Sequence, residues 1–180
     1  MIACENPTAA GSSITYDIGD IGPGGGIIFY RNDYGFIMTD DSQICHYLEA
    51  APEDMTPERR WSTKTEESFP DAARTGMGIG TGRKNTARII LADPYTLYEH
   101  AALACYKYSG NGHDDWFLPG RDELHELYEN RDEVGIPCGG YYWSSSQFSH
   151  SAAWIVNFSN GAHSCELKND TFRVRAIRAF

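Results

Sequence analysis

The part of the chain that decides the fold begins with Tyr141-Tyr-Trp-Ser-Ser-Ser-Gln147 and ends with Arg173-Val-Arg-Ala-Ile-Arg-Ala-Phe180. Two sets of side chains alternate between them: Trp154, Val156 and Phe158 in one, and Ile155, Asn157 and Ser159 in the other. This period of two is typical of a half-buried strand, so we expect the first set to face a core and the second, with an exposed Ile155, to face out. Segment 162–172 lacks a clean period, as a displayed loop or edge strand would. The layout predicts a fixed frame that displays a changeable binding surface.

Length and composition indicate one domain. With 180 residues, 41% hydrophobic and 13% aromatic, the chain can bury one substantial core, and we expect a single domain over residues 1–180. The 15 basic and 25 acidic residues give a formal net charge of −10, which repels nucleic acids and anionic lipids alike. We therefore expect no nucleic-acid partner.

The sequence gives no sign of membrane insertion. No run approaches the roughly 18 apolar residues that a membrane span needs. The start, Met1-Ile-Ala-Cys4, lacks the charged and apolar regions of a signal peptide. We expect a soluble chain that does not insert directly into a membrane.

A cluster of cations near the C-terminus runs against the acidic balance of the chain. Its members are Lys168, Arg173, Arg175 and Arg178. They could meet a sulfated or acidic ligand, but ion pairing with the chain's own carboxylates is the commoner arrangement. The sequence leaves both interpretations open and favours the second.

Five cysteines show no C-x-x-C spacing, which argues against a zinc ribbon or a thioredoxin-like site. They stand at positions 4, 45, 105, 138 and 165. Cys105 lies in an apolar helical pattern and is expected in the core. Cys165 falls in the displayed segment and is expected to be the most accessible thiol.

The first sixty residues predict short strands at 14–18, 27–30 and 34–38, with a turn at Asn32-Asp33. The glycines of Gly22-Pro-Gly-Gly-Gly26 are expected to form a loop between the first two of these strands. Gly80-Thr-Gly-Arg-Lys-Asn-Thr86 has backbone donors and two cations that would suit an anion, but it lacks the spacing of a phosphate-binding loop. A structural loop is the favoured interpretation.

Two helices are predicted. The first begins at Asp93-Pro94 and ends near Gly110, and the second follows Pro119-Gly120 and ends near Asn130. Their apolar faces consist of Leu97, Tyr98, Ala101, Ala102, Cys105 and Tyr108 in the first helix, and Leu124, Leu127 and Tyr128 in the second. Two helices among short strands predict an α+β domain.

Several polar groups are candidates for chemical sites. The run Ser144, Ser145 and Ser146 lies near His150, but it lacks a G-x-S-x-G elbow, so turn and hydrogen-bonding roles are favoured over a nucleophile. Other candidates are the possible cation ligands Asn111, His113, Asp114 and Asp115, the neighbours Cys45 and His46, and the acids Glu53 and Asp54. The cation ligands lack EF-hand spacing, and adjacent aspartates commonly cap a turn. We assign no catalytic residue, no cofactor and no metal.

Motifs along nearly the whole chain resemble the Lcl C-terminal domain family. They are Tyr16-Asp-Ile-Gly-Asp-Ile-Gly-Pro-Gly-Gly-Gly-Ile-Ile-Phe-Tyr30, Leu48-Glu-Ala-Ala-Pro-Glu-Asp54, Gly80-Thr-Gly-Arg-Lys-Asn-Thr86, Asn111-Gly-His-Asp-Asp-Trp-Phe-Leu-Pro119, Asp122-Glu-Leu124, Tyr142-Trp-Ser-Ser-Ser146 and Val174-Arg-Ala-Ile-Arg-Ala-Phe180. The resemblance implies a C-type-lectin-like fold of the formylglycine-generating-enzyme type. In that fold the N-terminal and C-terminal strands pair, and two helices flank small, twisted antiparallel sheets.

The stretch from Trp-Ser-Ser-Ser to Arg-Ala-Phe is also similar to the variable region of proteins that diversity-generating retroelements mutate. Such proteins bind ligands and do not turn them over, and the resemblance implies a variable segment over about 142–173. The implied ligand-facing positions are Phe148, Ser149, His150, Ser151, Ile155, Asn157, Ser159, His163, Ser164, Glu166, Asp170 and Phe172. The implied framework residues are Trp143, Trp154, Phe158 and Arg175.

The chain departs from related activities in two respects. It lacks the Glu-Pro-Asn or Gln-Pro-Asp and Trp-Asn-Asp elements of calcium-dependent lectins, and Lys168-Asn-Asp170 is the nearest approach. It also lacks the cysteine pair expected of a formylglycine-generating oxidase. The fold relationship therefore does not imply either activity.

The resulting prediction is a non-enzymatic receptor or adhesin at a cell surface, outside the cell or on a virion, with a protein or glycan ligand on a cell or virus. Three alternatives stay open. A fixed-specificity adhesin for acidic glycans would lose binding with salt and on neutralising Lys168. An oxidase-like enzyme would depend on Cys105 or Cys165, and a purely structural module would bind nothing. The sequence does not indicate the oligomeric state.

Overall fold

The computed structural model describes residues 14–63, 75–94 and 99–180. In these ranges the elements follow in chain order: β1 (Ile27–Ile37), β2 (Ile44–Ala50), β3 (Arg59–Arg60), α1 (Gly82–Ala92), α2 (Ala101–Lys107), α3 (Arg121–Glu129), α4 (Arg131–Val134), β4 (Tyr141–Gln147), β5 (Ala152–Asn157), β6 (His163–Leu167), β7 (Thr171–Phe172) and β8 (Ile177–Ala179). The strands form three antiparallel sheets, β1-β2-β8, β3-β7 and β4-β5-β6. The α+β class is confirmed, although these ranges hold more helices than the two predicted.

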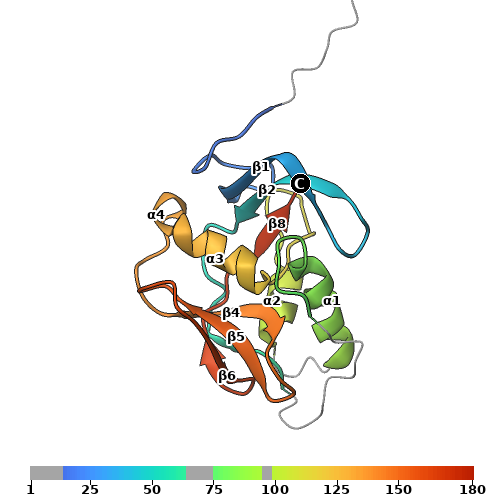
Figure 1. Cartoon of the computed structure of the whole chain (residues 1–180), viewed down its shortest axis with the longest axis vertical. Helices are drawn as coiled ribbons and strands as arrows, with labels where there is room; N and C mark the ends of the chain where they lie inside the picture. The colour runs from blue at the N-terminus through green and yellow to red at the C-terminus, as the bar shows by residue number, and fades with distance from the viewer. Residues whose placement is uncertain (1–13, 64–74, 95–98) are drawn as a thin grey trace, which may run out of the picture.

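The first and the last strands of the described residues lie in one sheet. β8 pairs with β2, and β2 pairs with β1. β1 and β8 therefore share a sheet, but β2 lies between them, so the direct pairing of these two strands that the resemblance implied is wrong. Past the end of β8, the amides of His46 and Tyr47 both donate to the carbonyl of Phe180, at 2.8 and 3.0 Å. The C-terminal residues are therefore built into the frame (Figure 1).

The predicted strand at 14–18 is wrong. The Asp20 amide donates to the Asp17 carbonyl at 3.1 Å, and the Asp17 amide donates to the Asp20 carboxylate at 2.8 Å, so this stretch closes a turn. The prediction that a turn at 32–33 separates two strands is also wrong. β1 runs through it, with its register against β2 shifted between Arg31 and Phe36.

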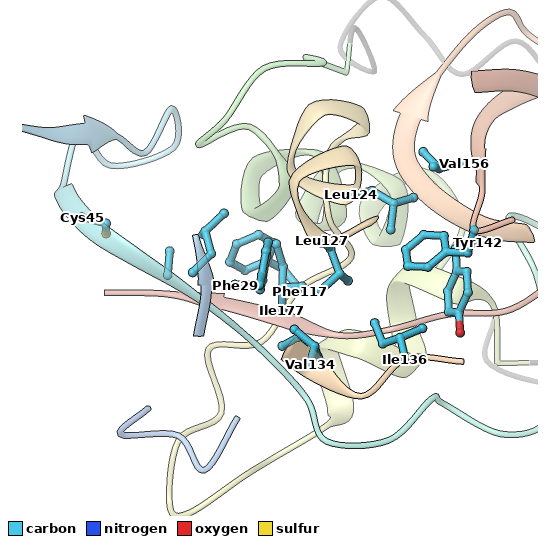
Figure 2. Close-up of a cluster of buried hydrophobic side chains, with 14 of the residues drawn as sticks. Phe29, Cys45, Phe117, Leu124, Leu127, Val134, Ile136, Tyr142, Val156 and Ile177 are labelled. Carbon is cyan, nitrogen blue, oxygen red and sulfur yellow. The ribbon is translucent and has the colours of Figure 1, made fainter. Parts of the chain in front are cut away.

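α3 lies between the two three-stranded sheets (Figure 1) and contacts β1, β4 and β5. Its bounds confirm the second predicted helix, with Leu124 and Leu127 buried. These leucines belong to a core that also holds Phe29 of β1, Phe117 and Tyr142 of β4 (Figure 2). α3 thus packs against both the β1-β2-β8 sheet, which we call the frame sheet, and the β4-β5-β6 sheet, and holds them together.

A second core lies around three tryptophans that are almost wholly buried: Trp61, Trp116 and Trp143. A buried indole N–H needs an acceptor. Trp61 donates to Ser144 O at 2.7 Å, Trp116 to His113 O at 3.2 Å and Trp143 to Arg59 O at 2.9 Å. The bonds of Trp61 and Trp143 connect segments more than eighty residues apart and tie β3 and its neighbour to β4, whereas the bond of Trp116 is local.

α1 was not predicted, because the stretch that begins it was interpreted as a structural loop. Its first residue, Gly82, lies so close to α3 that an added Cβ would come within 2.3 Å of the Glu123 carboxylate. Glu123 accepts hydrogen bonds from the amides of Gly80 (2.8 Å) and Gly120 (2.6 Å). One buried carboxylate therefore joins the starts of two helices.

The first predicted helix is shorter than expected. α2 begins after His100, whose Nδ1 accepts from the Leu103 amide at 3.3 Å, whereas the predicted start at Asp93 is the end of α1. Leu97 and Tyr98 of the predicted apolar face lie outside the described residues. Cys105 is fully buried, so its placement in the core is confirmed.

Candidate functional site

The predicted ligand-facing residues lie on the β4-β5-β6 sheet and on the turns around it. The register pairs Trp143 with Ile155 and Ile155 with Ser164, so these three share one face of the sheet. Ile155 is fully buried, and the expectation that it faces solvent is wrong. Both faces of β5 carry buried residues, so the period of two did not identify the solvent side.

The same face continues outward from Ile155 to a surface of aromatic and polar groups, which we call the Tyr141 surface. It consists of Tyr141, Asn157, Ser164, Glu166 and Phe172. The ring of Phe172 meets Tyr141 at 5.8 Å and the buried Trp143 at 4.9 Å between centroids, edge to face. A buried framework tryptophan thus supports a half-buried ring at the surface.

The opposite face of the sheet carries a second surface, the Phe148 surface. It consists of Phe148, Ala152, Trp154, His163, Cys165 and Leu167. Phe148, 55% exposed, packs edge to face on Trp154 at 5.1 Å, and the Arg121 guanidinium lies 5.3 Å over the Trp154 ring. Trp154 is only half-buried, so its predicted core position is wrong, whereas Val156 and Phe158 are buried as predicted.

The turn between β4 and β5 presents Ser149, His150 and Ser151. The Ser149 hydroxyl accepts from the amides of Ser151 (3.3 Å) and Ala152 (3.1 Å), which closes the turn. Below it, Lys168 donates to the His150 carbonyl at 2.9 Å. Two other predicted positions, Ser159 and Asp170, are exposed outside the strands.

Lys168 does not lie on the surface. It is 1% exposed, its ammonium lies 4.6 Å over the Trp61 ring, and burial lowers its pKa to about 7. The expectation that Lys168 could meet an acidic ligand is therefore wrong. Its side chain supports the turn from beneath.

The arginines of the cation cluster pair with carboxylates of the chain. Arg175 contacts Asp54 at 2.6 Å, and Arg178 contacts Glu49 at 2.8 Å and also Asp115. Arg173 lies 4.0 Å from Glu58. For these arginines the prediction of internal ion pairing is confirmed.

The family model for the Lcl C-terminal domain matches residues 53–178, a span that includes both surfaces. The chain belongs to the Lcl C-terminal domain family. It is also similar to a solved fimbrial protein from Bacteroides ovatus, with 16% identity and a TM-score of 0.56, over 86% of this chain and 44% of that one. This likeness shows the fold alone, and the chain spans less than half the length of the fimbrial chain. A comparison with curated proteins finds no match.

In this Lcl domain the serine run of β4 is buried and hydrogen-bonded. Ser144 donates to Trp154 O at 2.9 Å and Ser146 to Gly76 O at 2.7 Å, while Ser145 Oγ accepts from Asn85 at 3.1 Å. These bonds support the structural interpretation of the run.

Two of the four candidate cation ligands, Asn111 and Asp115, and the candidate acid Asp54 have other partners in the Lcl domain. Asn111 donates to Pro23 O at 2.7 Å, and Asp115 pairs with Arg178. Asp54 contacts Arg175 and accepts from the Tyr142 hydroxyl at 2.9 Å. Among the residues that the structure describes, no three His, Cys, Asp or Glu side chains converge as a metal site.

The accessibility of the cysteines differs from the prediction for Cys165. Cys138 is exposed and Cys165 is half-buried, so Cys165 is not the most accessible thiol. Burial raises the pKa of Cys45 and of Cys105, which keeps both as neutral thiols. In the described ranges no helix is long and apolar enough to cross a membrane.

Sequence reasoning missed a pocket beside the Tyr141 surface. It has a volume of about 630 Å³ and lies along β3 and β7, where Arg59 pairs with Phe172. Its walls include Glu58, Arg59, Arg60, Thr63, Glu99 and Thr171. The signal in the sequence was Arg59-Arg60 directly before Trp61, two cations beside a residue suited to a core. It was overlooked because β3 has only two residues.

Proposed function

We propose that this Lcl C-terminal domain is a non-enzymatic ligand-binding domain of a surface receptor or adhesin. In this proposal a retroelement diversifies segment 142–173 on a C-type-lectin-like scaffold. The ligand is a protein or glycan on a cell or virus, and it is bound without turnover.

The observation that carries the proposal is the separation of surface and frame within one short segment. Eleven of the twelve positions inferred to vary are exposed or half-exposed, the exception being Ile155. Three of the four framework residues, Trp143, Phe158 and Arg175, are buried, and the fourth, Trp154, is half-buried. A segment built in this way can exchange its outer side chains while its packing stays the same.

The surfaces have the composition of a binding site for a large ligand. Tyr141, Phe148 and Phe172 offer apolar rings, and Asn157, with its polar neighbours, offers hydrogen bonds. Partly exposed aromatic side chains beside polar groups are typical anchors of protein interfaces. The two surfaces lie on opposite faces of one sheet, so a ligand would contact one of them together with the turns.

Three observations support the scaffold and the location. The N-terminal and C-terminal strands share the β1-β2-β8 sheet, and the sheets are small and antiparallel. The similar solved structure is described as a fimbrial protein, which favours a surface-associated role. These features agree with the fold and location inferred from the resemblance.

The two alternative functions have less support. An acidic-glycan site built on the C-terminal cation cluster would need its cations at the surface, but Lys168 is buried and Arg175 and Arg178 are in ion pairs. An oxidase-like enzyme would need a thiol accessible to substrate. Of the two thiols that it could use, Cys105 is fully buried and Cys165 is half-buried.

The test is to sequence the 3′ end of the gene and its flanking DNA in a population. We expect adenine-linked substitutions at the exposed positions between Trp143 and Arg173, and a near-copy template beside a reverse-transcriptase gene. Codons of Ile155 and of the buried framework serve as the internal control and should not vary. An invariant segment without a template would overturn the diversification and leave an adhesin of fixed specificity.

A further inference from the structure

Two histidines from separate elements meet at the surface of the domain. His125 Nδ1 of α3 and His163 Nε2 of β6 lie 3.0 Å apart, and the two ring planes are inclined at 80°. On the other side of the His125 ring, Nε2 lies 3.6 Å from the Glu129 carboxylate, one helical turn further on. The chain separation of 38 residues shows that the fold, and not local sequence, brings the imidazoles together.

This geometry fits a shared metal ion. Two imidazole nitrogens, each about 2.0 to 2.1 Å from one ion, lie roughly 3.0 Å apart at a right angle and about 3.4 Å apart in a tetrahedron. A carboxylate at the second ring nitrogen is the usual partner of a histidine that binds a metal through the first. Glu129 lies on this side of His125 at 3.6 Å, so a small movement of its side chain would bring the carboxylate within hydrogen-bond distance of Nε2.

We propose that His125 and His163 bind a transition-metal ion such as Ni²⁺ or Zn²⁺, with Glu129 as a positioning residue for His125. Imidazole ligands suit these ions, and a metal held by two of them keeps further positions for water. For both facing nitrogens to bind the ion, the ring that donates the hydrogen bond must carry its proton on its other nitrogen, which in His125 is the Nε2 that faces Glu129. The site does not depend on the proposed function, although it needs the histidine at position 163.

Other groups also surround the pair. Glu129 faces His125, and the Tyr128 ring stacks on His125 with 5.9 Å between the ring centroids.

The test uses the whole chain without a histidine tag. Calorimetric titration with NiCl₂, and separately with ZnCl₂, at about pH 7.5 should give saturable binding of one ion. His125→Ala and His163→Ala should each abolish this binding, and Glu129→Gln should weaken it roughly 10-fold. His46→Ala is the control, because His46 is exposed on β2 and should bind like the original chain.

A second readout needs no substitution. Substoichiometric Cu²⁺ should broaden the NMR signals of His125 and His163 before those of the other histidines. The proposal is overturned if the chain binds no ion, if His163→Ala binds as well as the original chain, or if other histidines broaden first. Circular dichroism of each variant confirms that a loss of binding is not a loss of folding.

Discussion

Arg178 and Glu49 form a buried ion pair between neighbouring strands, with Nη1 of the arginine 2.8 Å from the carboxylate. Their backbones are also directly paired in the sheet of β2 and β8. The Glu49 carboxylate accepts in addition from the amides of Gly24 (3.0 Å) and Gly26 (3.0 Å). An added Cβ at Gly24 would lie 2.7 Å from this carboxylate, so the glycine loop is shaped to the pair.

Removing the carboxylate should therefore destabilise the frame. Glu49→Gln leaves the Arg178 guanidinium buried with a weakened set of partners, and breaking a buried pair costs about 3 to 5 kcal/mol. Urea denaturation should show this loss in the free energy of unfolding. Glu53→Gln, an exposed position nearby, is the control and should change stability by less than about 0.5 kcal/mol.

Glu123 should make stability depend on pH. Burial raises its pKa to about 7, although the amides of Gly120, Gly80 and Gly82 act to lower it. Between the ordinary value of 4.5 and about 7 the folded chain keeps a proton that the unfolded chain releases. The folded state therefore loses stability as pH rises through this window, by up to about 3 kcal/mol.

The measurement is the free energy of unfolding from about pH 4 to 8, for the original chain and for Glu123→Gln. The substitution should remove most of the slope in the window, because glutamine does not titrate. Glu133→Gln, at an exposed site, should keep the slope. An unchanged slope in Glu123→Gln would show that other groups cause it.

Ile155 and Ser164 are direct neighbours on one face of the sheet, yet they should respond very differently to substitution. Ile155→Ala removes buried methyl groups from the core around Trp143 and should cost about 2 to 5 kcal/mol. Ser164→Ala should cost less than about 0.5 kcal/mol. Thermal and urea unfolding of the two variants measure the difference, and equal costs would contradict the separation of frame and surface.

Short-range signals predicted part of this structure. Pro119-Gly120 followed by Glu123 in the first turn marked α3, and the helix has these bounds. The start of α1 escaped because Gly82, Arg83 and Lys84 carry no apolar period. In the structure, Arg83 pairs with Asp40 and Asp41, partners more than forty residues away.

In the candidate site, too, the local sequence pattern did not predict contacts with distant segments. Alternation placed Val156 and Phe158 in the core, but it put Ile155 outside and Trp154 inside. Whether a β5 side chain is buried depends on what covers each face, and both faces meet a buried cluster. The sequence could not show which carboxylates pair with the cation cluster, because partners such as Asp54 lie far away in the chain, 121 residues from Arg175.

The turn between β5 and β6 offers a test of how tightly the displayed segment rests on α3. Gly161 has a φ of +73°, and an added Cβ would lie 2.4 Å from the Tyr128 ring. Gly112 has a similar φ of +82°, but nothing lies within 4 Å of its added Cβ. Both alanine variants carry the cost of a left-handed backbone, about 1 kcal/mol, and Gly161→Ala should lose at least about 1 kcal/mol more through the clash. Urea unfolding of the two variants isolates the contact term, and equal losses would show that Tyr128 moves aside freely.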